Sequence, residues 1–316
     1  MDKNIKDFRL FRLRSTRSII KSGYRLYLDN FRKIFRSTWL VAIVYALASG
    51  ILMNILTTLL PNYFISMMVS AYAQDGAEGN PTMNLHLLFV GIALVFTIVS
   101  ALLAAFGFTL LAEHRDTESM SGATKWYGKL DKGILVKTLA TWLSMLVFCA
   151  LYFAIGNIAN VYGQQYLSRI AVMALVGIWT VLFFVILPPV MLWMVKYIMS
   201  AKGKTKEKQH LLRYWGSSIA VSLVTAIVTY ILTLLTELPA FVLFSANIVS
   251  QAGALQGDPT GMPDYMSWLN IVVFSLAGFI QAYIYLSSLF PFYYLYGSTE
   301  AQEKERKELP SAPADL

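Results

Sequence analysis

Long uninterrupted runs of apolar residues dominate the chain, and short charged segments separate them. The first run, Trp39 to Leu60, contains 22 residues and no charge. At ~1.5 Å of rise per residue, a helix of this length crosses a hydrocarbon core of ~30 Å. The pattern therefore predicts a membrane helix here and, by the same reasoning, in five further runs. The six predicted spans are residues 39–60, 85–112, 138–158, 170–195, 217–238 and 268–290.

These runs predict an all-α fold, a polytopic membrane helix bundle with six transmembrane helices arranged as three hairpins. The membrane domain covers residues 38–299 and leaves no room for a separate soluble domain. The remaining residues, 300–316, form a charged and then proline-rich tail, which we expect to be cytoplasmic and disordered.

Prolines follow or interrupt four of the predicted spans. Pro61 and Pro239 are expected to end the first and fifth spans, and Pro291 to break the sixth, because proline lacks the N–H of a helix interior. The pair Pro188-Pro189 is expected to kink or end the fourth span. The aromatic run FYYLY after Pro291 is typical of a belt at the membrane interface.

Residues 1–37 are basic and amphipathic. Their apolar positions recur at spacings of three and four, which places them on one face of a helix. We expect this helix to lie in the membrane interface, with its cations towards anionic lipid headgroups. The apolar stripe comprises Ile20, Tyr24, Tyr27, Phe31 and Phe35, and the predicted headgroup contacts are Arg25, Arg32, Lys33 and Arg36.

The composition is that of a protein solvated by lipid, with 57% hydrophobic and only 14% charged residues. The net charge of +8 could indicate a nucleic-acid partner, but its distribution argues against one. All but one of the 26 Lys and Arg lie in four segments, residues 1–36, 115–137, 196–213 and 300–316, which alternate with the predicted outer loops. This is the positive-inside pattern of a membrane protein with both termini in the cytoplasm.

An internal repeat relates the two ends of the membrane domain. A shift of 178 residues aligns Pro61 with Pro239 and the turn GNPT at 79–82 with GDPT at 257–260, without a gap. Each copy consists of a span, a proline, an apolar outer segment, the turn and the next span. We therefore predict three related two-span hairpins, the middle one with a shortened outer loop, in a parallel arrangement.

The fifth predicted span carries a stripe of hydroxyl residues at spacings of three and four. Such a stripe could line a polar path, or it could pack against another helix, since Ser and Thr are ordinary residues of helix interfaces in membranes. Gln281, in the sixth span, could hydrogen-bond to this face. The hydroxyl stripe comprises Ser218, Ser222, Thr225, Thr229, Thr233 and Thr236.

No ionisable residue lies at mid-depth in any predicted span, which argues against proton or ion coupling. Glu237, at the outer end of the fifth span, is the best single candidate for a functional acid, and the alternative is an exposed interfacial carboxylate. The triplet His114-Arg115-Asp116 is only a lookalike of a kinase catalytic loop, because the other kinase motifs are missing. No ligand spacing for a metal or motif for a cofactor is present, so we expect no enzyme activity.

The basic aromatic lead SGYRLYLDNFRKIFRSTW running into the first of six spans resembles uncharacterised bacterial inner-membrane proteins. Those proteins in turn look like the membrane domain attached to some glycerophosphodiester phosphodiesterases. The resemblance implies an inner-membrane location and carries no catalytic residues. We expect a non-enzymatic scaffold or accessory subunit of a membrane assembly, with lipids and membrane proteins as partners. The alternative is a carrier or channel for a lipid-like or uncharged small solute.

Overall fold

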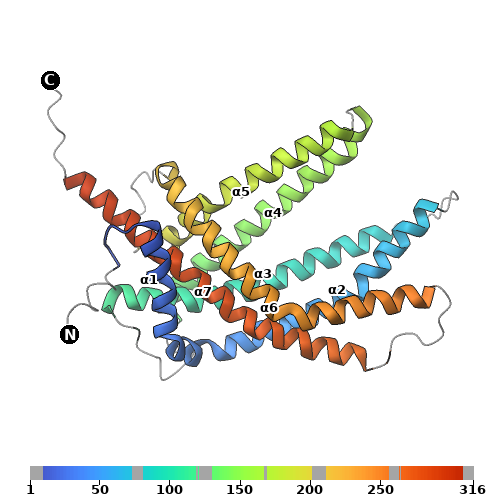
Figure 1. Ribbon diagram of the computed structural model, residues 1–316, viewed down its shortest axis with the longest axis horizontal. Helices are drawn as coiled ribbons and strands as arrows, with labels where there is room; N and C mark the ends of the chain where they lie inside the picture. Colours follow the sequence, from blue (N-terminus) through green and yellow to red (C-terminus); the bar gives the residue numbers. More distant parts are fainter. Residues whose placement is uncertain are drawn as a thin grey trace. The chain divides into compact units, whose positions relative to one another are not determined.

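All regular structure in the described part of the chain is helical (Figure 1). The computed structural model describes residues 10–72, 81–118, 120, 130–166, 169–200, 211–255, 263 and 265–308. The all-α class is therefore confirmed. The helices are α1 (Thr16–Asp29), α2 (Phe31–Tyr72), α3 (Pro81–Thr117), α4 (Lys132–Tyr166), α5 (Arg169–Met199), the short 3-10 helix η2 (Leu211–Tyr214), α6 (Trp215–Leu255) and α7 (Met266–Glu308).

Within the described residues, five helices contain segments long and apolar enough to cross a membrane, as in a multi-pass membrane protein. The remaining predicted span, the fourth, 170–195, lies within α5, whose described side chains form a shorter apolar stretch, Val185–Met199. α5 packs beside α4, to which only two residues connect it (Figure 1). The five segments are Phe31–Thr57, Val90–Thr117, Lys132–Leu151, Trp215–Ser250 and Met266–Lys307.

The predicted helix ends at the prolines are wrong. α2 continues past Pro61 to Tyr72, and α6 continues past Pro239 to Leu255. α5 is helical through both of its prolines, and α7 runs through Pro291 to Glu308. Residues 300–308 are therefore helical rather than disordered, and the rest of the predicted tail, 309–316, lies outside the described residues.

A side chain of the next helix compensates for one of the two prolines of α5. Pro189 has no N–H, so it cannot donate to the carbonyl of Val185, its usual partner four residues back. The indole Nε1–H of Trp215 donates to that carbonyl instead, at 3.0 Å. Ser218 Oγ donates to the carbonyl of Pro188 at 2.7 Å, a further bond from α6 to a carbonyl whose position in the helix also faces the N–H of Leu192. A helix can thus continue through proline in an apolar environment when a neighbour supplies the missing donor.

The chain forms two compact units, and four of the long helices contribute to both. Unit 1 comprises Met1–Thr38, Ala104–Val228 and Leu286–Leu316; unit 2 comprises Trp39–Leu103 and Thr229–Tyr285. Of the twelve largest fully buried side chains among the described residues, eleven belong to unit 1. The tightest apolar core therefore lies in unit 1.

The aromatic run after Pro291 belongs to this core. Tyr293, Tyr294 and Leu295 are fully buried, and Tyr296 is 8% exposed. The prediction of an interfacial belt is therefore wrong for these residues, because packed protein rather than headgroups covers them. Arg14, just before α1, is one of the residues that pack against the run. Its guanidinium carbon lies 4.7 Å from the Tyr294 ring centroid.

Helix α1 crosses α7 in close contact (Figure 1). It begins at the N-cap Ser15, whose Oγ accepts from the N–H of Ser18. It ends where Asn30 Nδ2 donates to the carbonyl of Leu26 at 3.0 Å. Asn30 separates α1 from α2, so the basic lead is not one continuous helix.

The buried face of α1 is offset from the predicted stripe. Its buried residues are Ile19, Gly23, Leu26 and Tyr27, and the Tyr27 ring lies 5.1 Å from that of Phe290. Of the predicted stripe, only Tyr27 is buried, Ile20 and Tyr24 are half-buried, and Phe31 and Phe35 are exposed and belong to α2. The offset arises because α1 places a glycine, rather than its aromatic residues, at the closest approach to α7.

We predict that Gly23→Ala destabilises unit 1. A Cβ at this position would lie 2.6 Å from the backbone nitrogen of Pro291, and backbone cannot yield as a side chain can. Overpacking of this kind costs about 1–3 kcal/mol. The melting temperature of the purified protein in detergent should fall. Gly177→Ala in α5 is the control, because its Cβ would meet nothing within 4 Å; equal melting of the two variants would contradict the close packing.

We also predict that Trp215→Phe lowers stability by about 1 kcal/mol, since it leaves the Val185 carbonyl without its donor. Pro189→Ala restores a backbone N–H to that carbonyl. The cost of Trp215→Phe should therefore be smaller in the Pro189→Ala background than in the parent protein. Melting temperatures of the four proteins in this double-mutant cycle test the coupling. Purely additive effects would show that the indole does not replace the missing donor.

Candidate functional site

A cavity of about 250 Å³ lies in unit 2, between α2, α6 and α7. Most of its lining is apolar, including the rings of Phe241, Phe244 and Phe274. Four polar side chains also reach it: Ser49 and Thr57 from α2, Glu237 from α6 and Gln281 from α7. A mostly apolar hollow with a few convergent polar groups is the usual form of a small-molecule site.

The packing of α6 on α7 sets the register of the cavity. Asn247 Nδ2 donates to Asn270 Oδ1 at 3.1 Å, and both side chains are buried. Nearby, Ala240 belongs to one apolar cluster with Phe274 and Ala277. Because residue numbers rise along α6 as they fall along α7, the two helices are antiparallel, and this register brings Glu237 and Gln281 to the same cavity.

Small residues let α2 approach α7 at the cavity. A Cβ on Gly278 would lie 2.9 Å from Ser49 Cβ, and one on Gly50 would lie 2.8 Å from the carbonyl oxygen of Ile271. Close helix contact through small residues is the usual way in which membrane helices associate. The contact holds Ser49 beside the part of α7 that carries Gln281.

Glu237 and Gln281, two residues named from the sequence, thus meet in one cavity although they lie on different helices. Glu237 forms no ion pair with any residue in the described part of the chain, and its side chain is exposed. Gln281 Oε1 is buried and has no hydrogen-bond partner among the described residues. Gln281 was expected to bond to the hydroxyl stripe, but its carbonyl oxygen makes no such bond.

The hydroxyl stripe lies on the inward face of α6. Ser218 and Thr225 are buried, and the other four hydroxyl residues are half-buried, whereas Leu223, Ile227 and Leu235 are exposed. Ser218 makes the structural bond to the Pro188 carbonyl described above. Thr236 donates to the carbonyl of Thr233 within α6. Thr225 Oγ1 and Thr233 Oγ1 are buried without a hydrogen-bond partner among the described residues. In the described part of the chain, the bond that joins the stripe to another helix is therefore that of Ser218.

The four predicted headgroup contacts, Arg25, Arg32, Lys33 and Arg36, are all exposed. Arg25 Nε lies 3.5 Å from Asp29 Oδ2, one turn along α1. Arg25 also borders a polar hollow of about 370 Å³ at the start of α1. The other polar groups of this hollow are Arg12, Arg14, Lys21, Ser15, Ser18 and Ser22, which the sequence analysis did not single out.

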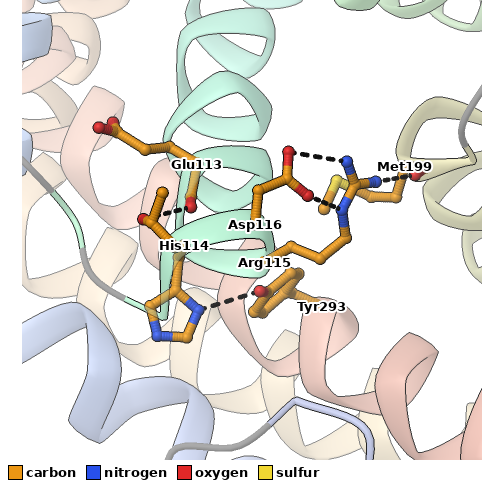
Figure 2. A network of polar contacts seen from close by, with 7 residues as sticks. Glu113, His114, Arg115, Asp116, Met199 and Tyr293 are labelled. Carbon is orange, nitrogen blue, oxygen red and sulfur yellow. Dashed lines mark hydrogen bonds and ion pairs between the residues drawn. The ribbon is translucent and has the colours of Figure 1, made fainter.

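A second polar cluster in unit 1 was missed by sequence reasoning. Figure 2 shows the consecutive residues His114, Arg115 and Asp116 at the end of α3. His114 Nδ1 lies 3.0 Å from the hydroxyl oxygen of Tyr293, and both residues are buried. Arg115 Nε donates to Asp116 Oδ1 at 2.7 Å, and its Nη1 donates to the carbonyl of Met199. The kinase lookalike is thus a structural link between α3, α5 and α7.

Cations also secure the end of α5. Lys137 Nζ donates to the carbonyl of Ser200 at 2.8 Å. Lys196, only 4% exposed, pairs with Glu303 at 3.0 Å and with Glu300 at 3.4 Å. Together with Arg115, these lysines place positive charge at a helix C-terminus, where exposed carbonyls favour it. Tyr214, whose ring lies 5.4 Å from Lys196 Nζ, has its pKa raised by burial.

Comparisons with known proteins give no relative: no family model, no curated protein and no solved structure matches the chain.

Proposed function

We propose that the protein is a six-span protein of a bacterial cytoplasmic membrane, with both termini inside and α1 at the inner interface. Five apolar helices support the multi-pass class. The 31 residues of α5 are long enough for the one further span, 170–195. The three hairpins are α2–α3, α4–α5 and α6–α7. The four basic segments support the orientation, and the exposed cations of α1 and α2 suit anionic headgroups.

The proposed internal repeat relates α2–α3 to α6–α7. α2 and α6 have 42 and 41 residues, each continues past a proline, and each is followed by a second long helix. The proposed kinship with the membrane domains attached to glycerophosphodiester phosphodiesterases rests on the basic aromatic lead and on the same layout.

Within this class, we propose a non-enzymatic scaffold or accessory subunit of a membrane assembly. The observation that carries the proposal is the use of the hydroxyl stripe: it faces inward on α6, and Ser218 satisfies a backbone carbonyl of α5. A hydroxyl group with that role stabilises a helix seam, as expected of a scaffold.

A carrier or channel for a lipid-like or uncharged solute is the second candidate. The cavity of unit 2 favours it, because its lining is largely apolar and its polar groups are few. The two candidates differ in the effect expected of a bulky residue in the hydroxyl stripe. In a scaffold it should lower thermal stability, and in a carrier it should abolish transport without unfolding the protein.

One test of this proposal concerns topology. Cysteines introduced at Gly76 and Gly257 in a Cys149→Ala background should react with a membrane-impermeant thiol reagent in intact cells. Cysteines at Lys125, Lys206 and Ala314 should react only after the cells are permeabilised, because the basic segments stay inside. Equal labelling at Gly76 and Lys125 in intact cells would contradict the proposed orientation.

Another test distinguishes the scaffold from the carrier. Thr229→Ala should be nearly neutral, since hydrogen bonds between membrane helices average only about 0.6 kcal/mol. Thr229→Leu should lower the melting temperature in detergent, because it adds bulk to a half-buried position. Ile227→Leu, on the exposed face of the same helix, is the control and should melt like the parent. A Thr229→Leu variant that melts normally but has lost an activity would favour the carrier.

A further inference from the structure

We propose that the cavity of unit 2 binds a small amphiphile that carries a primary ammonium group. The proposal rests on the membrane location proposed above, but it does not depend on the choice between scaffold and carrier. It follows from the chemistry of the groups that face the cavity.

Two of the four polar side chains that reach the cavity carry acceptor oxygens without a hydrogen-bond partner among the described residues. Glu237 presents a carboxylate, and Gln281 presents an amide oxygen that is buried and has no partner among the described residues. Buried polar atoms in folded proteins are almost always hydrogen-bonded. A ligand that fits these two groups must therefore donate hydrogen bonds.

The charge of Glu237 makes a cation the preferred donor. The Glu237 side chain is exposed at the cavity and lies among apolar lining residues, and its carboxylate attracts a cation there more strongly than it would in bulk water. No Lys, Arg or His of the described residues forms an ion pair with Glu237. A primary ammonium group brings three N–H donors on one compact charge, enough for the Glu237 carboxylate and Gln281 Oε1 together.

The remainder of the lining requires an apolar body. Met53 and Leu56 from α2 and the three phenylalanine rings from α6 and α7 surround the space beyond the polar groups. Phe241 is both a lining residue and 65% exposed, so it marks the opening of the cavity. At about 250 Å³ the cavity holds the ammonium group and the first part of an alkyl chain, whose remainder leaves past Phe241.

The test uses the full-length protein purified in detergent, with 11-bromoundecylamine as the probe and 11-bromoundecanol as its neutral match. Phe244→Trp places a fluorescent indole at the cavity wall, and bromine quenches indole at short range. We expect saturable quenching by the amine, with half-saturation at an about tenfold lower micellar mole fraction than for the alcohol, because a charge-assisted bond is stronger than a neutral one. Parent protein, without the added indole, corrects for quenching by probe in the micelle.

Glu237→Gln in the Phe244→Trp protein should lower the affinity for the amine about tenfold, to that for the alcohol. The affinity for the alcohol should stay unchanged. Retained alcohol binding shows that the cavity is intact. Glu237→Asp, which keeps the charge, should keep the preference for the amine. Glu300→Gln removes a carboxylate of unit 1 outside the cavity and should change nothing.

Three results would overturn the proposal: equal binding of amine and alcohol, an amine affinity that survives Glu237→Gln, or quenching that never saturates. Because the test uses purified protein, it succeeds or fails independently of the cysteine-labelling experiment, which tests orientation in cells.

Discussion

Backbone carbonyls inside an apolar environment need a donor from the protein, because hydrocarbon supplies none. α5 places the heaviest demand of this kind on unit 1, since it contains two prolines and ends among other helices. Trp215 and Ser218 donate to carbonyls at the prolines, and Arg115 and Lys137 donate to carbonyls at the C-terminus. The donors come from α3, α4 and α6, so satisfying the backbone of one helix also fixes the positions of three others.

Because of this requirement, some basic residues stabilise the helices as well as marking the proposed orientation in the membrane. Their distribution along the chain is sufficient to propose an orientation, yet several of them have structural partners. Lys196 is buried between two carboxylates of α7, and Arg115 and Lys137 bind helix carbonyls. Such residues cannot also contact headgroups freely. The predicted headgroup contacts Arg25, Arg32, Lys33 and Arg36 are exposed, so a lipid contact is consistent with the structure for all four.

The helices could be predicted from sequence because a run of apolar residues determines both their type and their approximate position. Their ends could not, because proline ends a helix only when its lost hydrogen bond stays unmade. Whether Trp215, thirty residues from Val185, supplies that bond depends on tertiary structure. The same limit hid the pairing of His114 with Tyr293, which are 179 residues apart. A buried aromatic run and an interfacial one also have the same composition, so FYYLY was assigned to the wrong environment.

The candidate site shows the same division between local and tertiary information. Glu237 stands out in sequence as a charge in an apolar run, and Gln281 as an amide in another. Only the antiparallel register of α6 and α7, set in part by Asn247 and Asn270, brings them to one cavity. The buried charge of unit 1 is neutralised by the protein itself, as at Lys196, whereas the acceptors of this cavity have no donor among the described residues. An unsatisfied acceptor at a cavity wall is costly for stability alone, and the proposed ammonium ligand would supply the donor that Gln281 Oε1 lacks among the described residues.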